Sequence, residues 1–78
     1  MNKLGLWVKD KRLNASLNQK EYAEKIGITD VTLSKIENSG HVSGRTLRKL
    51  SEFFNINTKI LREMMLFEKE EAVNEQEL

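Results

Sequence analysis

Residues 19–38 contain two short amphipathic patterns separated by a single turn at Gly27, and this spacing leaves few ways to fold. The turn is too short for the two predicted helices to lie antiparallel, so they have to cross at a steep angle. At such a crossing one side chain must be small, and Ala23 lies one helical turn before Gly27. The apolar residues available for the shared core are Tyr22, Ile26, Leu33 and Ile36.

The spacing of these residues is that of a helix-turn-helix. With Gln19 counted as the first residue, Ala23 falls at position five, Gly27 at nine, Leu33 at fifteen and Ile36 at eighteen. Four constrained positions make a moderately specific motif, and an all-helical basic setting strengthens it. The competing interpretation is an ordinary pair of core helices, the second with a solvated outer face.

Apolar residues recur at helical rather than alternating spacing along the chain, which contains no proline. Three helix starts share one arrangement: an apolar residue, a capping residue, and an apolar residue four positions later. They are Leu17-Asn18 with Tyr22, Ile28-Thr29 with Leu33, and Ile56-Asn57 with Leu61, and Glu21 gives the first a capping box. Gly27 and the Ser39-Gly40 pair are typical helix ends. The sequence predicts an all-α fold of five helices, at about residues 3–14, 18–26, 29–38, 44–54 and 57–72.

Size and composition exclude several classes of function. The 78 residues suffice for one small domain, and the chain has no cysteine and one histidine, so neither a disulfide framework nor a metal site is expected. No glycine-rich phosphate loop or enclosed acid pair suggests an enzyme or a cofactor. No apolar run approaches the ~20 residues that span a bilayer. We therefore expect a cytoplasmic protein with no membrane or small-molecule partner.

The small net charge of +1 hides an asymmetry along the chain. Residues 1–62 hold twelve Lys and Arg against six Asp and Glu, a net charge of +6. Residues 63–78 hold one lysine and six glutamates, a net charge of −5. The first part is basic enough to meet phosphate, whereas the tail is not.

Residues 9–38, with the sequence KDKRLNASLNQKEYAEKIGITDVTLSKIEN, resemble the helix-turn-helix family of lambdoid phage repressors and Cro proteins, also called the XRE family. The likeness covers about residues 4–61, and LNQ at 17–19, Gly27 and IEN at 36–38 are its most specific parts. Within the family it is greatest to the DNA-binding domain of the phage 434 repressor. The resemblance implies a five-helix, lambda-repressor-like DNA-binding domain with an extended C-terminal helix.

The resemblance also implies that the helix at 29–38 enters the major groove of double-stranded DNA. Asp30, Val31 and Lys35 would then face base edges, with Ser34 close by. Lys35 can donate to guanine or touch a phosphate, and Val31 can pack on a thymine methyl. Asp30 can accept from a cytosine amino group, or it can simply stabilise the helix dipole, the interpretation that we favour. The 434 relatives carry amide side chains at the positions of Asp30, Val31 and Lys35. We therefore expect this protein to bind a different operator sequence from theirs.

Other residues are expected to contact the DNA backbone. Gln19 combines a side-chain amide with a helix N-terminus, which is a natural anion site, and the family uses this residue and Asn18 for phosphate. Asn18 also has a role as helix cap. Asn38 resembles a further backbone contact, and Arg45 matches a family arginine that approaches the minor groove. Arg48 is either another backbone contact or a surface charge for solubility.

Arg12 and Glu37 are predicted to form a structural ion pair. Arg12 is four residues after Val8 and lies on the apolar stripe of its helix, and Glu37, four after Leu33, leans toward the same core. A buried charge without a partner costs several kcal/mol. The two residues should therefore pair with each other, as the matching pair does in the family.

The sequence is divided into a DNA-binding domain at 1–62 and a helical extension with an acidic tail at 63–78. Leu61 and Met64 can close the core with Ile60 beside them, whereas three apolar residues extend beyond it: Met65, Leu66 and Phe67. Exposed clusters of this kind usually mark an interface, here that of a homodimer, although the helix could also fold back as core. Two copies one DNA turn apart, ~34 Å, would read a palindrome.

Two functions are consistent with these observations. The first is a sequence-specific transcription regulator, most simply a repressor. The second is a protein-interaction module that has kept the fold and lost DNA binding, as in an antitoxin or a regulator's partner. The acidic Asp30 and the neutral Val31 on the reading face support the second. Binding to bulk duplex DNA across salt concentrations separates them.

Overall fold

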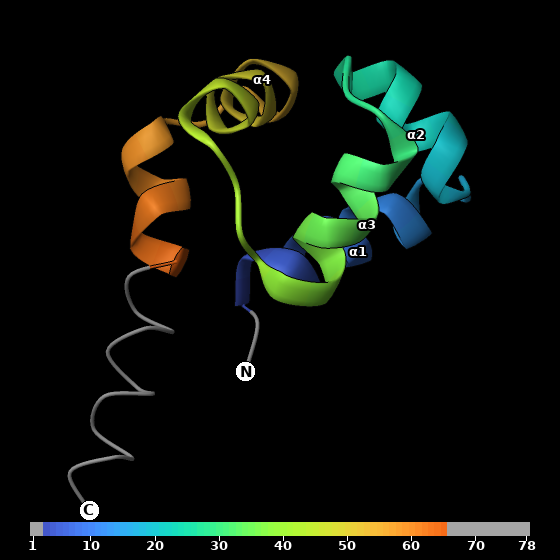
Figure 1. Cartoon of the computed structure of the whole chain (residues 1–78), viewed down its shortest axis with the longest axis horizontal. Coiled ribbons are helices and arrows are strands. Elements are labelled where there is room, and N and C mark those ends of the chain that lie inside the picture. Colours follow the sequence, from blue (N-terminus) through green and yellow to red (C-terminus); the bar gives the residue numbers. More distant parts are fainter. Residues whose placement is uncertain (1–2, 66–78) are drawn as a thin grey trace, which may run out of the picture.

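The computed structural model of the chain describes residues 3–65. The first four helices are α1 (Lys3–Asn14), α2 (Gln19–Ile26), α3 (Asp30–Ser39) and α4 (Gly44–Phe54) (Figure 1). Residues 58–65 are helical as well, and no strand occurs in the described part. The prediction of an all-α, five-helix fold is confirmed, with helix bounds within one residue wherever they are described. The predicted end of the last helix, at 72, lies outside the described residues.

The predicted capping residues begin the helices where the sequence placed them. Asn18 accepts a hydrogen bond from the Glu21 backbone N–H at 2.8 Å, and the Glu21 carboxylate accepts one from the Asn18 N–H at 3.1 Å, which completes the capping box. Thr29 caps α3 through the Thr32 N–H. These bonds satisfy backbone donors that a helix N-terminus leaves without partners. A further cap, Ser43 at the start of α4, was not predicted.

Gly27 ends α2 in the left-handed conformation, with φ 93° and ψ 31°. Its N–H and that of Ile28 both donate to the Ala23 carbonyl oxygen, at 2.9 and 3.0 Å. This turn joins α2 to α3 within three residues, as the motif requires. Ala23 is 1% exposed, in keeping with the need for a small side chain at the crossing.

Replacing Gly27 by alanine is expected to lower the free energy of unfolding by about 1–2 kcal/mol, the cost of a left-handed conformation for a residue with a Cβ atom. The cost is conformational, because an added Cβ would meet nothing within 4 Å. Urea unfolding measures it. Gly44→Ala is the matched control, since Gly44 is helical with equally open space and should not lose stability. Equal losses in both variants would contradict the conformational explanation.

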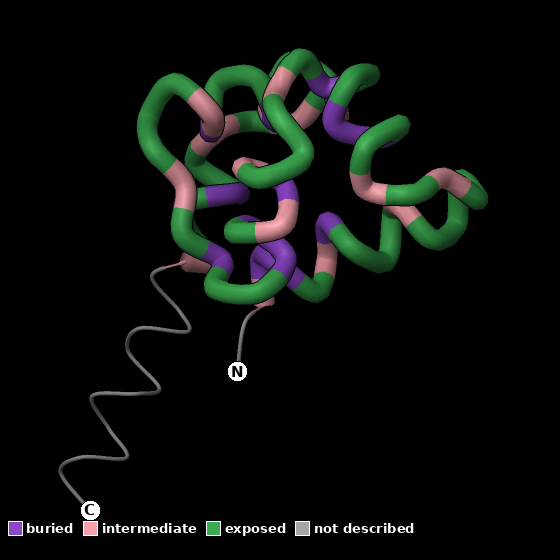
Figure 2. The backbone as a smooth tube through the Cα atoms, turned by 45° about the vertical axis from the view of Figure 1, so that its right-hand side comes forward, coloured by how far each residue is buried: buried purple, intermediate pink, exposed green. Residues whose placement is uncertain are grey.

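The core lies where α1 packs against α3, and α2 against α3 and α4. Figure 2 shows the buried segments gathered between the helices, with long exposed stretches outside. Leu61, in the helix at 58–65, is fully buried and closes the core as predicted. No helix within residues 3–65 is long and apolar enough to cross a membrane. The remaining core residues are Leu4, Val8, Tyr22, Ala23, Ile26, Leu33, Ile36, Leu47 and Leu50.

Four aromatic rings close one side of this core. Trp7 is half-buried, and its ring lies edge-on to that of Phe54 with the centroids 4.7 Å apart. Tyr22 meets Phe53 edge-on at 5.5 Å. The Lys11 ammonium lies 5.4 Å from the centre of the Trp7 ring, within the range of a cation–π interaction. This cluster joins α1 and α2 to the C-terminal end of α4.

The helix at 58–65 differs from the prediction in two respects. Ile60, expected beside the core, is 47% exposed, because it lies about 100° around the helix from the buried Leu61. Met65, expected beyond the core, is half-buried and packs against it. The other two residues assigned to dimerisation, Leu66 and Phe67, lie outside the described residues. The division between 1–62 and 63–78 falls inside this helix and stays a prediction.

Candidate nucleic-acid interface

The helix α3 has two faces of different character. Its inner face consists of Leu33 and Ile36, both 0% exposed, together with the buried Glu37. Its outer face carries the residues that the sequence assigned to DNA, and none of them is buried. The exposed ones are Asp30, Val31, Lys35 and Asn38, whereas Ser34 is half-buried.

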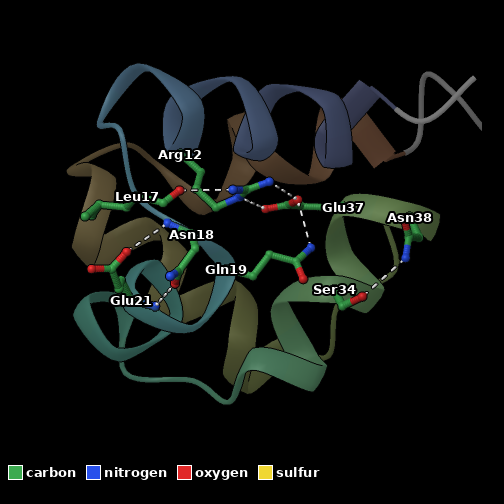
Figure 3. Close-up of polar contacts among 8 residues, drawn as sticks. All are labelled: Arg12, Leu17, Asn18, Gln19, Glu21, Ser34, Glu37 and Asn38. Carbon is green, nitrogen blue, oxygen red and sulfur yellow. Dashed lines mark hydrogen bonds and ion pairs between the residues drawn. The ribbon is translucent and has the colours of Figure 1, made fainter.

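The outer face of α3 carries one apolar side chain, Val31, among polar side chains, several of which make local hydrogen bonds. Val31 is 60% exposed, so most of its apolar side chain is open to solvent. Asp30 Oδ1 accepts the backbone N–H of Val31 at 2.9 Å, which places its charge at the helix N-terminus. This geometry is the one expected of a carboxylate that stabilises the helix dipole. Asn38 Nδ2 donates to Ser34 Oγ at 3.3 Å, one turn apart on the same face (Figure 3).

Arg12 and Glu37 are in direct contact between α1 and α3. Arg12 Nε donates to Glu37 Oε2 at 2.8 Å and Nη2 to Oε1 at 3.1 Å, a bidentate pair. The side chains are only 12% and 2% exposed. Such a pair resists separation, because either charge left alone in the core would be unsatisfied.

The N-terminus of α2 is tied into this ion pair. Gln19 is half-buried, and its Nε2 donates to Glu37 Oε1 at 3.1 Å. Arg12 Nη1 donates to the carbonyl oxygen of Leu17 at 3.0 Å, just before the cap Asn18. Figure 3 shows these groups converging from α1, α2 and α3. The sequence assigned Gln19 to phosphate and missed its bond to Glu37, which only the crossing geometry of the helices reveals.

Arg45 and Arg48, both exposed on α4, are placed differently. Arg45 lines a shallow groove between α4 and the turn from α2 to α3, and Arg48 does not. Lys49, which the sequence reasoning missed, lines the same groove and donates to the Gly27 carbonyl oxygen at 2.7 Å. A signal for it existed, because Lys49 is four residues after Arg45 and shares its helix face. Three threonines complete the polar lining: Thr29, Thr32 and Thr46.

One titratable group near the ion pair is perturbed. Burial raises the pKa of the Tyr22 phenol above its ordinary value of 10.0, and the negative charge of Glu37 raises it further. Both effects disfavour the phenolate. Within residues 3–65, no group of His, Asp or Glu side chains is arranged to hold a metal ion.

The raised pKa of Tyr22 predicts a loss of stability at high pH. The unfolded chain ionises Tyr22 near pH 10, whereas the folded chain keeps the proton to higher pH. The free energy of unfolding is therefore unaffected by Tyr22 below pH ~10, and above it falls by about 1.4 kcal/mol per pH unit until the folded pKa is reached. Urea unfolding of wild type and Tyr22→Phe measures this, and the ultraviolet absorbance of the single tyrosine reports the titration. Equal alkaline losses in both proteins would contradict the assignment.

Comparison with known proteins agrees with this geometry. A family model described as helix-turn-helix matches residues 8–61, more than half of the chain, with α2, α3 and α4 inside it. The chain belongs to the XRE-type helix-turn-helix family. It is a DNA-binding transcription regulator of that family, with α3 as the second helix of the motif.

One relative among curated proteins is the ImmF control region 10 kDa protein of Bacillus phage phi105. It is 36% identical over 61 residues, which cover 77% of this chain and 68% of the relative. No solved structure matches the chain. The chain is therefore similar to a protein that is named for a phage control region.

Proposed function

We propose that this XRE-type protein is a sequence-specific repressor that binds a palindromic operator on double-stranded DNA as a homodimer. One observation carries the proposal. The outer face of α3 is open to solvent, although its inner face is fully committed to the core. Its dimensions suit the major groove, which admits one α-helix.

Residues on this face have distinct proposed roles. Val31 packs on a thymine methyl group, and Lys35 donates to guanine O6 and N7. Asp30 stays at the helix N-terminus, because its carboxylate already accepts the Val31 N–H. Ser34 and Asn38, joined by a hydrogen bond, lie at the edge of the reading face, with Asn38 against phosphate.

The backbone contacts flank α3 on both sides. Asn18 and Gln19 present a helix N-terminus and side-chain amides to one phosphate. Arg45 and Arg48 approach the backbone from α4, with Arg45 nearer the turn that Lys49 holds. Contacts of this kind position the protein without reading sequence.

A homodimer supplies the affinity that one reading helix lacks. Each copy reads few base pairs, and two copies spaced one DNA turn apart, ~34 Å, read two half-sites. We place the contact between copies at Met65, Leu66 and Phe67, and add Ile60 of the helix at 58–65 because 47% of its surface is exposed. Analytical ultracentrifugation of wild type and Ile60→Lys tests this placement. The variant should dimerise more weakly than wild type, because a lysine replaces an apolar residue of the proposed contact.

Repression follows from occupancy of a promoter. The relative from phage phi105 is named for a control region, and we propose a comparable controlling role for this chain. A reporter gene tests the direction of control. An operator overlapping the promoter should lower expression when the protein is made, and raised expression would assign an activator instead.

Selection of bound sequences from random duplex DNA tests the proposal as a whole. A palindromic consensus with half-sites one turn apart would support sequence recognition and the dimer together. In the same assays, Arg45→Gln or Arg48→Gln neutralises one phosphate contact in each copy. Two contacts are then lost from the bound dimer, and the slope of log affinity against log salt should fall by ~1.8. Lys9→Gln is the control, because Lys9 is exposed on α1, to which no DNA contact is assigned.

The competing function is a protein-interaction module. It is favoured by the acidic Asp30 on the reading face, since a carboxylate repels phosphate. If the wild-type protein binds no duplex DNA even at low salt, this function replaces the repressor. Binding that is retained at low salt and lost steeply as salt rises excludes it.

A further inference from the structure

Glu37 lies where three helices meet, and it is the carboxylate that holds them together. It receives two hydrogen bonds from Arg12 of α1 and one from Gln19 of α2, while belonging to α3 itself. Oε1 is shared, because Arg12 Nη2 and Gln19 Nε2 both donate to it at 3.1 Å. Figure 3 shows the three side chains meeting at this point.

The network fixes the start of α2 in two ways. The Gln19 side chain is held by Glu37, and the Leu17 carbonyl oxygen is held by Arg12 at 3.0 Å. Between these two residues lies Asn18, whose own side chain is used to cap the helix. The candidate phosphate site at the N-terminus of α2 therefore rests on a charge pair in the core.

The chemistry of the contact also sets the orientation of the Gln19 amide. A primary amide has a donor end and an acceptor end, and only the donor end is favourable beside a carboxylate. The nitrogen therefore faces Glu37, and its second N–H makes no hydrogen bond with any residue among 3–65. Without Glu37 the amide could rotate and turn its oxygen, which repels phosphate, toward the DNA.

We propose that Glu37 is a positioning residue for the DNA-backbone contact of α2. It presents the second N–H of Gln19 to phosphate and fixes that contact relative to the reading helix α3, to which it belongs. The proposal rests on the proposed function, in which Gln19 contacts phosphate. Its consequence is a loss of affinity that is uniform across DNA sequences, because a backbone contact reads no bases.

The test separates positioning from folding. The double variant Arg12→Met/Glu37→Leu replaces the buried pair with apolar side chains, an exchange that is often neutral or stabilising. It leaves the net charge unchanged, so general attraction to DNA is preserved. Affinity for a mixed-sequence duplex at low salt is compared among wild type, Gln19→Ala, the double variant and the triple variant Arg12→Met/Gln19→Ala/Glu37→Leu. Circular dichroism and thermal melts confirm that each is folded.

We expect Gln19→Ala and the double variant each to weaken binding by about ten-fold per bound copy, the worth of one charge-assisted hydrogen bond, and so by about a hundred-fold for the dimer. The triple variant should be no weaker than either, because all three remove the same contact. The slope of log affinity against log salt should not change, since a neutral amide releases no counterion. Wild-type affinity in the double variant, or losses that multiply in the triple variant, would overturn the proposal.

A second variant covers the case in which the double variant does not fold. Glu37→Asp keeps the negative charge for Arg12 but shortens the side chain by one methylene, so it should lose Gln19 and reproduce the loss in affinity. Full affinity in folded Glu37→Asp would also overturn the proposal. If wild type itself binds no duplex at low salt, the proposed function is wrong. If wild type binds and the variants bind with the same affinity, only the positioning role of Glu37 is wrong.

Discussion

Replacing Glu37 by glutamine is expected to lower the free energy of unfolding by about 3–5 kcal/mol, the cost of removing one partner of a buried ion pair. Glutamine keeps the shape of the side chain but leaves the Arg12 guanidinium, 12% exposed, without a counter-charge. It also presents an amide where two donors, from Arg12 and Gln19, now share one carboxylate oxygen. Since small domains have total stabilities of roughly 5–15 kcal/mol, much of the stability would be lost.

Urea unfolding followed by circular dichroism measures this loss. Glu24→Gln is the matched control, because Glu24 is an exposed glutamate on α2, and it should change stability by less than about 0.5 kcal/mol. The base preference of any folded Glu37→Gln protein should be that of wild type, since Glu37 faces the core. A thermal melt indistinguishable from wild type would refute the importance of the pair.

Leu33→Ala should cost about 2–5 kcal/mol, because it leaves a cavity under the reading helix. Leu33 is 0% exposed and lies on the inner face of α3. Val31→Ala, two residues earlier in the same helix, should change stability by less than about 0.5 kcal/mol, because Val31 is 60% exposed. The two variants thus probe the two faces of one helix.

The base preference in DNA binding should respond in the opposite order, with a change in Val31→Ala and none in Leu33→Ala. Val31→Ala removes the methyl groups proposed to touch thymine, so it should lower the preference for that base in a selection from random duplexes. Leu33→Ala, studied at a temperature where it is folded, should keep the wild-type consensus. If Val31→Ala binds the same sequences with the same ranking, the assignment of α3 as the reading helix through Val31 is wrong.

The sequence predicted those features that depend on neighbours within four residues. The caps at Asn18 and Thr29, the left-handed Gly27 and the core residue Leu33 all follow from local spacing, and all are confirmed. Helix caps and turns are set by the conformation of a few adjacent residues, so their signals lie together in the chain. The pairing of Arg12 with Glu37 needed in addition the rule that buried charges require partners.

Contacts between helices were less accessible to sequence reasoning. The bond from Gln19 to Glu37 spans eighteen residues, and that from Lys49 to Gly27 spans twenty-two. Both depend on how far apart and at what angle the helices pack, which spacing along the chain does not specify. The exposure of Ile60 was missed for a different, local reason, because consecutive residues of a helix lie about 100° apart and an apolar residue next to the buried Leu61 need not share its face. The DNA roles of Val31 and its neighbours stay predictions.

The aromatic cluster at one side of the core gives the protein its own optical probe. Trp7 is the single tryptophan of the chain, and its indole ring contacts Phe54 and lies near the Lys11 ammonium. None of these three residues belongs to the proposed DNA interface. Tryptophan fluorescence should therefore follow the separation of α1 from α4 during unfolding and stay nearly constant when DNA is added. Folding and binding can thus be followed in one sample by separate signals, tryptophan emission for the first and a labelled duplex for the second.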